Sequence, residues 1–197
     1  MRAPLRCPLR EIDAFLAEKS AWVMRQIERI RLAAPVGGVP KRAENGVVFS
    51  LLGEDVTIVF RDDLAKNKAK LSGDRLYLPS NGADAALNAF LRRFAKDYLS
   101  ERCAYFAAKT GVKYKSVSVT AAKTRWGSCS GDNRLNFSYR LMYARKDVID
   151  YVVIHELSHI FEKNHSAAFW AIVEKYCPDY KEKRAFLKEH AYYTDVF

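Results

Sequence analysis

The sequence predicts an α+β fold: a long helix and a small mixed sheet pack on a helix that carries two histidines, and further helices follow toward the C-terminus. Two observations support this class. Apolar residues recur at helical spacing over 84–110 and 148–159, whereas short runs of alternating or β-branched residues lie between turn residues elsewhere in the chain. With 197 residues, 49% of them hydrophobic, the chain can bury a sizeable core as one compact unit. We expect residues 1–82 to form a first helix and a small β region, and residues 83–197 to form the part that carries the histidines.

The N-terminal region is expected to contain one amphipathic helix and three short strands. The helix spans about residues 9–33, and Pro35 and Gly37-Gly38 end it. Its apolar face consists of Ile12, Phe15, Leu16, Trp22, Val23, Ile27 and Ile30. The strands follow at 47–51, 56–60 and 75–78, and the first two form a hairpin across Gly53.

The region after residue 83 alternates helices with two more strands. A helix over 84–110 ends at Gly111. Strands at 116–120 and 134–139 are joined through Trp126-Gly127-Ser128 and the turn Gly131-Asp132-Asn133. The histidine helix comes next. A helix over 166–176, capped by Ser166, and a last helix from Asp179 follow it, and Asp179-x-x-Glu182 is typical of a capping box.

The segment His155-Glu156-Leu157-Ser158-His159, followed by His165, has the layout of a catalytic zinc site. Residues four apart share one helix face, so His155 and His159 can both direct an imidazole toward one ion, with Glu156 beside it. Zinc takes about four ligands, and a catalytic site keeps one position for water. We therefore predict that His165 is the third protein ligand and that the cofactor is Zn²⁺.

His165 can reach the metal only if the helix ends before it. We expect Asn164 to end the helix in the left-handed conformation, so that a sharp turn brings His165 beneath the other two ligands. Glu162 is the alternative third ligand, or it accepts a hydrogen bond from a ligand, a role that Asp150 could also fill.

A cluster of histidines that serves only the core is the alternative to a metal site. The residues before the motif are strongly apolar, and unpaired imidazoles and a carboxylate on such a helix would be costly unless something satisfied them. These residues are Val148, Ile149, Val152, Val153 and Ile154. The context therefore favours a metal.

The charge of the chain is strongly basic and unevenly distributed. There are 33 Lys and Arg against 23 Asp and Glu, a net charge of +10, and residues 101–146 contain 10 basic and 2 acidic residues. Interleaved aromatic residues make a nucleic-acid surface conceivable, but no known nucleic-acid motif accompanies them, so a solvated basic face is the favoured interpretation.

The cysteines and the apolar stretches indicate the class of compartment. Cys7, Cys103, Cys129 and Cys177 are scattered without a Cys-x-x-Cys pair, which predicts free and mostly buried thiols. No apolar run approaches the roughly 20 residues that span a bilayer, and the first residues do not resemble a secretory signal. We expect a cytoplasmic protein without a membrane segment.

Several motifs together resemble the YgjP-like metallopeptidase family, also called the domain of unknown function 45 family. The resemblance covers residues 84–197 densely and the first helix more loosely, and its motifs are Lys123-Thr124-Arg125-Trp126-Gly127-Ser128-Cys129, Leu135-Asn136-Phe137, Ile149 to His159, Asn164-His165-Ser166, Phe169-Trp170 and Cys177-Pro178-Asp179-Tyr180. It implies a zincin fold, zinc on His155, His159 and His165, and Glu156 as the catalytic acid and base. Members usually carry strands ahead of the first helix, whereas this chain begins almost directly with it, so we expect an incomplete upper sheet or a misassigned start.

The predicted activity is hydrolysis of peptide bonds through a zinc-bound water and Glu156 as general base. Arg125 and Tyr139 are candidates for stabilising the oxyanion, although each could equally serve a salt bridge or the core. Residues 117–120 or 123–128 could pair with an extended peptide substrate, although ordinary packing within the sheet is an equally good interpretation. His190 is expected to be a cation at the end of the last helix. The alternatives are a zinc-containing basic module that binds nucleic acid or nucleoprotein, and a metal hydrolase of a non-peptide amide or ester.

Overall fold

The computed structural model describes residues 8, 10, 13–15, 17–20, 24, 39, 40, 42–66 and 68–190. By internal contacts the chain divides into two compact units, residues 1–34 and 35–197. In the first unit, the described residues from 10 to 24 are helical, in agreement with the predicted helix. Most of the apolar face expected for it lies outside the described residues, as do Pro35, Gly37 and Gly38; Phe15 is described and is exposed.

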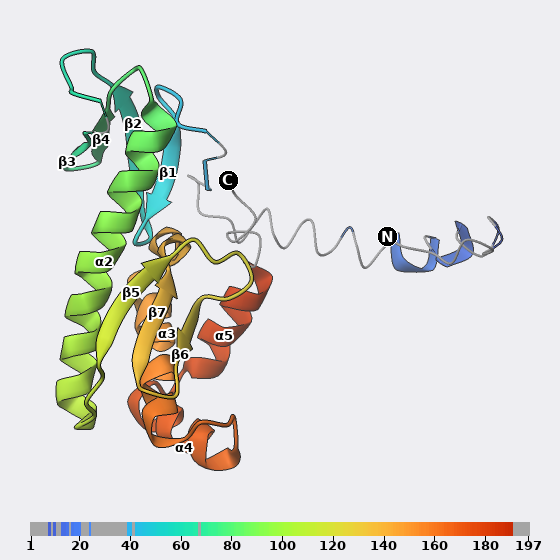
Figure 1. Cartoon of the computed structure of the whole chain (residues 1–197). Helices are drawn as coiled ribbons and strands as arrows, with labels where there is room; N and C mark the ends of the chain where they lie inside the picture. Colours follow the sequence, from blue (N-terminus) through green and yellow to red (C-terminus); the bar gives the residue numbers. More distant parts are fainter. Residues whose placement is uncertain are drawn as a thin grey trace. The chain divides into compact units, whose positions relative to one another are not determined.

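A four-stranded mixed sheet precedes the long helix (Figure 1). Its strands are β1 Val48–Leu51, β2 Glu54–Phe60, β3 Lys70–Ser72 and β4 Arg75–Leu78, in the order β1-β2-β4-β3. The predicted hairpin is confirmed: Leu51 pairs with Glu54, and the two loop residues Leu52 and Gly53 have φ of 56° and 86°, as a type I′ turn requires. β3 was not predicted, because three residues with one apolar side chain are too few to distinguish a strand from a loop.

The long helix α2 spans Ala83–Thr110 and ends where Gly111 adopts φ 77°, as the sequence predicted. Its 28 residues extend about 40 Å at 1.5 Å per residue. The strands that precede α2 and the strands that follow it therefore pack near different parts of its length. β4, which precedes α2, contacts it, and so do β5 and α3, which follow it. This length explains why the strands form two small mixed sheets and not the single sheet that we expected.

The second sheet has three strands, β5 Ser116–Thr120, β6 Gly127–Cys129 and β7 Arg134–Ser138. β7 is central: it pairs with β5 in parallel and with β6 in antiparallel orientation. Residues 127–129 were expected to be only a connection, but they form an edge strand of this sheet.

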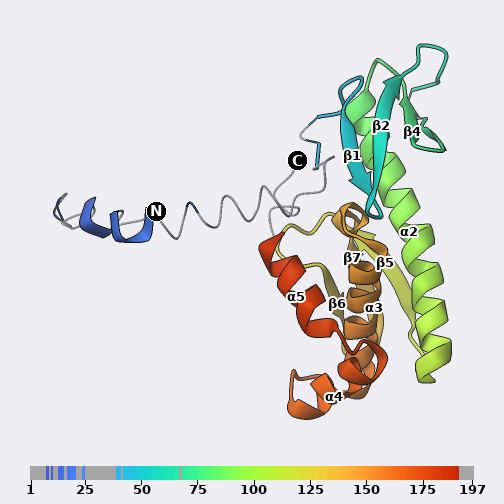
Figure 2. The same cartoon turned by 180° about the vertical axis from the view of Figure 1, so that it is seen from behind.

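The remaining chain is helical. It forms η1 Tyr139–Tyr143, α3 Lys146–Phe161, α4 Ala167–Tyr176 and α5 Tyr180–Glu189. α3 lies against the second sheet, behind it in Figure 1 and in front of it in Figure 2, and contacts β6, α2, α4 and α5. Ser166 caps α4 as predicted, since its Oγ accepts a hydrogen bond from the Phe169 N–H at 3.3 Å. The prediction of a capping box at the start of α5 is wrong. The Asp179 carboxylate accepts a hydrogen bond from Lys183 Nζ at 2.7 Å and does not cap the helix.

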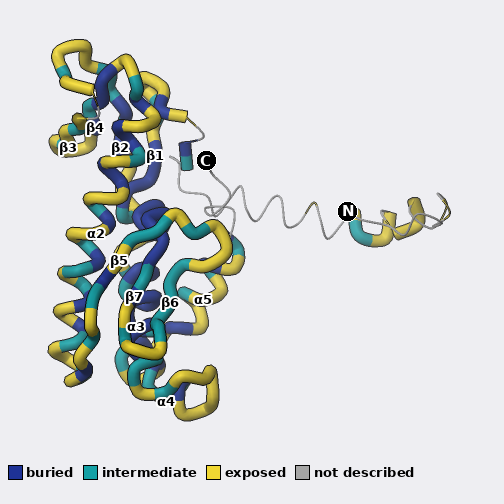
Figure 3. The backbone as a smooth tube through the Cα atoms, in the orientation of Figure 1, coloured by how far each residue is buried: buried dark blue, intermediate teal, exposed yellow. Residues whose placement is uncertain are grey.

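One continuous hydrophobic core runs through the second unit from Ala43 to Leu187. In Figure 3 buried stretches pass through β1, β2 and α3, and every residue of η1 is buried as well. α3 is buried along most of its length, so the histidine motif lies on an element that cannot shift without disturbing the core. No helix in the described part of the chain combines the length and apolarity that crossing a membrane requires.

Candidate metal centre

Three imidazoles converge where α3 ends and α4 begins. His155 and His159 lie one helical turn apart on α3, and their ring centroids are 5.0 Å apart. His165, immediately before the cap of α4, brings its ring to 5.0 Å from His155 and 4.7 Å from His159. The ligand atoms that the three histidines can offer all lie within 4.8 Å of one another. The structure therefore brings the three predicted ligands together.

The turn that places His165 differs from the expected one. α3 ends at Phe161, and Glu162 leaves the helix in an extended conformation with φ −134°. Among the described non-glycine residues only Leu52 and Asn133 have positive φ, so the predicted left-handed stop at Asn164 is wrong. The chain reverses earlier, through extended backbone that any residue can adopt.

The geometry fits a tetrahedral metal ion. His155 Nε2 and His165 Nε2 are 3.1 Å apart, and two nitrogens on zinc at about 2.0–2.1 Å would be roughly 3.3 Å apart. His159 Nδ1 lies 3.1 Å from the backbone oxygen of Glu162. A hydrogen bond donated by Nδ1–H fixes the tautomer that leaves Nε2 with a free lone pair.

The protonation of the histidines also suits a metal. Burial, followed by the neighbouring His159 and His165, lowers the pKa of His155 to about 3. Burial is also the main cause that lowers the pKa of His159. Only neutral imidazole binds a metal, so these two side chains are held in the binding form at neutral pH.

An aromatic platform supports the three imidazoles. The ring of the fully buried Phe169 lies 4.9 Å from His155, 4.5 Å from His159 and 4.8 Å from His165. Trp170 stacks on His165 at 5.7 Å and on Tyr180 at 5.2 Å. Phe169-Trp170 was one of the motifs of the family resemblance, and its position just after Ser166 is the sequence signal that these rings pack near His165.

Glu156 is a buried carboxyl beside these imidazoles. Glu156 is 5% exposed. Burial raises the pKa of its carboxyl to about 8, and the charge of Arg125 partly opposes this rise. The edge strand β6 lies directly against it: a Cβ atom added at Gly127 would be 2.6 Å from Glu156 Oε1. Only glycine permits this approach.

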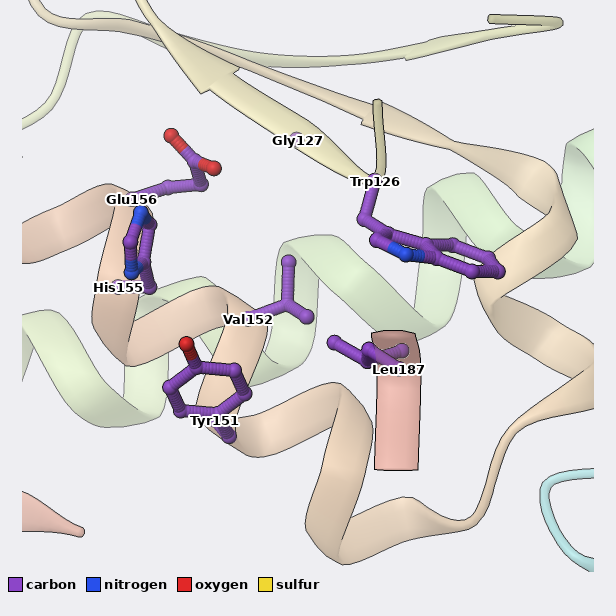
Figure 4. A pocket seen from close by; sticks show the side chains of 7 residues that line it. All are labelled: Trp126, Gly127, Tyr151, Val152, His155, Glu156 and Leu187. Carbon is purple, nitrogen blue, oxygen red and sulfur yellow. The ribbon is translucent and has the colours of Figure 1, made fainter. Parts of the chain in front are cut away.

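A cavity of about 200 Å³ opens beside Glu156 (Figure 4). Its lining consists of Trp126, Gly127, Tyr151, Val152, His155, Glu156 and Leu187. Burial raises the pKa of the Tyr151 hydroxyl to about 12, so it stays protonated. Tyr151 was missed in the sequence, although it lies four residues before His155 on the same helix face; nothing in the sequence pointed to Leu187, which α5 contributes.

Three other residues that the sequence suggested for the site, Glu162, Asp150 and Tyr139, do not join the cluster of imidazoles. The Glu162 carboxylate does not belong to the cluster of possible ligand atoms, and its backbone carbonyl contacts His159 instead. Asp150 accepts two hydrogen bonds from Arg102, at 2.7 and 2.8 Å, and is thereby engaged in bridging α3 to α2. Tyr139 is a core residue, 2% exposed, whose hydroxyl donates to Asn88 Oδ1 at 3.0 Å.

Two further groups of predicted residues lie outside the cluster. His190 is buried at the end of α5, where its Nδ1 lies 2.8 Å from the Phe186 carbonyl oxygen. Cys103 and Cys177 are buried free thiols and Cys129 is half-buried, as predicted, while Cys7 lies outside the described residues.

Comparison with known proteins gives one family and one solved structure. The family model described as "YgjP-like, metallopeptidase domain" matches residues 1–190. The crystal structure of the metallopeptidase zymogen of Pyrococcus abyssi abylysin is similar over 46% of this chain and 93% of that chain, with 20% sequence identity and a TM-score of 0.42. No curated protein matches.

Proposed function

The chain belongs to the YgjP-like metallopeptidase domain family, and from this premise we propose that it is a zinc-dependent peptidase of the zincin type. In this proposal His155, His159 and His165 hold the ion, Glu156 is the general base, and the substrate is a peptide or protein. The observation that carries the proposal is the convergence of three imidazoles and a buried carboxyl beside one cavity.

The three imidazoles form a donor set that suits zinc and leaves a fourth position for water or substrate. Zinc bound there would supply a Lewis acid that lowers the pKa of water and polarises a carbonyl group. A closed structural site would normally have a fourth protein ligand, and the described His, Cys, Asp and Glu residues contribute none to this cluster.

Glu156 has the position of a proton carrier. A cation held by the neighbouring imidazoles would favour the ionised form of the Glu156 carboxyl, against the effect of burial. The carboxylate then accepts a proton from the attacking water and delivers it to the leaving amine as the C–N bond breaks. The burial of Glu156 excludes competing solvent from this transfer.

β6 is the element best placed to hold the substrate. Within the described residues it pairs only with β7, so its other edge is open to an added strand, and Gly127 brings that strand against Glu156. An extended peptide that pairs with this edge would pass beside the carboxylate. Of the two segments considered from the sequence, the geometry favours the one that contains Gly127.

The test is digestion of a peptide library by the zinc-loaded chain and by Glu156→Gln. We expect cleavage by the wild type and a loss of at least about 10²-fold in the variant, with zinc content unchanged, because the substitution keeps the size of the side chain and removes the base. Glu174→Gln, at an exposed glutamate on α4, is the matched control and should retain full activity. Undiminished cleavage by Glu156→Gln would refute the mechanism, and a zinc-loaded wild type that cleaves no peptide would refute the function.

A further inference from the structure

Tyr151 presents a hydroxyl group to the cavity beside the candidate metal ligands. The residue is 4% exposed, and its ring lies edge-on to His155 with 5.9 Å between ring centroids. Figure 4 shows the hydroxyl directed into the cavity on the side of His155. It forms no hydrogen bond with any residue in the described part of the chain. Because a buried tyrosine hydroxyl usually finds a partner, one that meets only a cavity is available to a ligand.

The position of Tyr151 follows from the helix that carries the metal ligands. Residues 151, 155 and 159 are successive members of one i, i+4 row on α3, so the hydroxyl lies on the same face as the two imidazoles. α3 is held in the core, and its backbone hydrogen bonds keep this row rigid. The distance between hydroxyl and metal site is therefore set by the fold and not by a mobile loop.

Arg184 places a positive charge next to one of the aromatic rings that contact the imidazoles. The Arg184 guanidinium lies 4.8 Å from the centroid of Trp170, the ring that stacks on His165. Burial raises the pKa of the Tyr151 hydroxyl, and the charge of Arg184 partly opposes that rise. Arg184 also adds to the lowering of the His155 pKa, after burial, His159 and His165. Among the described residues, Arg184 forms no ion pair.

We propose that Tyr151 is a catalytic residue that donates a hydrogen bond to the oxyanion formed when water attacks the scissile carbonyl. This inference rests on the proposed function and adds a group to it. The water oxygen bonds to the carbonyl carbon, the π electron pair moves onto the carbonyl oxygen, and Glu156 takes the proton. When the tetrahedral species collapses, the C–N bond pair goes to nitrogen, which receives that proton from Glu156. Tyr151 keeps its own proton throughout, and its hydrogen bond strengthens as the oxygen becomes negative.

The structure distinguishes Tyr151 from the two residues considered from the sequence. The Tyr139 hydroxyl donates a hydrogen bond to Asn88 Oδ1 inside the core and cannot reach a substrate. Arg125 is exposed and influences Glu156 through its charge. Tyr151 alone of the three belongs to the lining of the cavity that contains both His155 and Glu156.

The experiment compares the zinc-loaded wild type with Tyr151→Phe, which keeps the ring and removes the hydroxyl. Four quantities are measured: kcat, KM, the Kd of a phosphinic peptide that mimics the tetrahedral oxyanion, determined by calorimetry, and the zinc content. We expect kcat to fall about 10²-fold and the phosphinic peptide to bind at least about 10-fold more weakly. KM and zinc content should stay unchanged, because the hydroxyl acts on the transition state and holds no metal.

Tyr139→Phe is the control. It removes a hydroxyl from an equally buried tyrosine outside the cavity, so it should lower the melting temperature and leave kcat and phosphinic-peptide binding unchanged. The proposal is overturned if Tyr151→Phe keeps the kcat and Kd of the wild type, or if restoring its zinc content restores its activity, since the hydroxyl would then act only on the metal site.

Failure of the proposed function would give a different result. A wild type that cleaves no peptide but binds the phosphinic peptide more tightly than Tyr151→Phe refutes peptidase activity while supporting the contact with an oxyanion. A wild type that neither cleaves peptides nor binds the phosphinic peptide overturns both.

Discussion

Gly127→Ala tests whether β6 presses against the proposed catalytic carboxylate. The added Cβ would lie 2.6 Å from Oε1, 2.8 Å from Cγ and 2.9 Å from Cδ of Glu156. Favourable contacts between carbon atoms lie at about 3.5–4.0 Å, so the carboxylate or the strand must retreat by roughly 0.7–1 Å. The carboxylate lines a cavity and can move into it, whereas β6 is held by its pairing with β7. We therefore expect Glu156 to move.

A displacement of this size has a large effect on activity and a smaller one on stability. Moving a catalytic group by about 1 Å can lower the rate about 10²-fold. Overpacking a buried contact lowers the free energy of unfolding by roughly 1–3 kcal/mol, and each kcal/mol corresponds to about 2–4 °C in Tm for a chain of this size. We expect Gly127→Ala to lose about 10²-fold in kcat, to melt several degrees lower and to keep its zinc.

The assay is steady-state peptide cleavage together with thermal unfolding and zinc analysis. Gly131→Ala is the control, because a Cβ there would meet no atom within 4 Å, and both activity and Tm should be retained. In the background of Glu156→Asp, which is one methylene shorter, the same Gly127→Ala change should lower Tm less than in the wild type. If Gly127→Ala has the kcat and Tm of the wild type, β6 does not contact Glu156 and the reasoning fails.

Three further predictions concern the metal, the core and one ion pair. A chelator should abolish peptide cleavage, and added zinc should restore it. His165→Ala should lose zinc at chelator concentrations that leave the wild type loaded. If the variant and the wild type retain zinc equally in a competition titration, His165 is not a ligand. Burial raises the pKa of Cys103 to about 12 from an ordinary value near 9, so the folded state binds the thiol proton more tightly than the unfolded state does. The stabilisation that this proton gives the folded state is complete below pH 9 and declines between pH 9 and 12. Denaturant unfolding across that range should show a slope steeper by up to about 1.4 kcal/mol per pH unit in the wild type than in Cys103→Ala, and equal slopes would contradict it. Arg102→Ala and Asp150→Ala should each lower the free energy of unfolding by about 1 kcal/mol, because their side chains are 22% and 25% exposed and solvent screens the pair; a double-mutant cycle with no coupling would show that the pair contributes nothing.

Some features of the fold follow from interactions within a few residues, and these were predictable. The hairpin needs two residues with positive φ between its strands, and Gly53 marks the place. Gly111 ends α2 and Ser166 caps α4 for equally local reasons. The proximity of the His155 and His159 imidazoles follows from helical periodicity alone.

Other features depend on which segments pack together although they are far apart in the sequence, and the pattern of neighbouring residues does not predict such packing. The role of Gly127 arises only because β6 pairs with β7 and lies on α3, so that a chain segment about 30 residues before Glu156 contacts its carboxylate. Tyr139 and Asp150 could have served the site by their chemistry, but the fold pairs them with Asn88 and Arg102.

What the sequence determined by itself is therefore the chemistry of the centre: two histidines and a glutamate on one helical turn, and a third histidine just before a helix cap. The tertiary structure alone decided what surrounds that chemistry, namely the strand above Glu156, the Phe169 platform beneath the imidazoles, and the cavity that Tyr151 and Leu187 share. The physical reason is range. Backbone sterics and hydrogen bonds act over about four residues and are read directly from sequence spacing, whereas burial is a property of the whole core and selects among many pairings that are each locally acceptable.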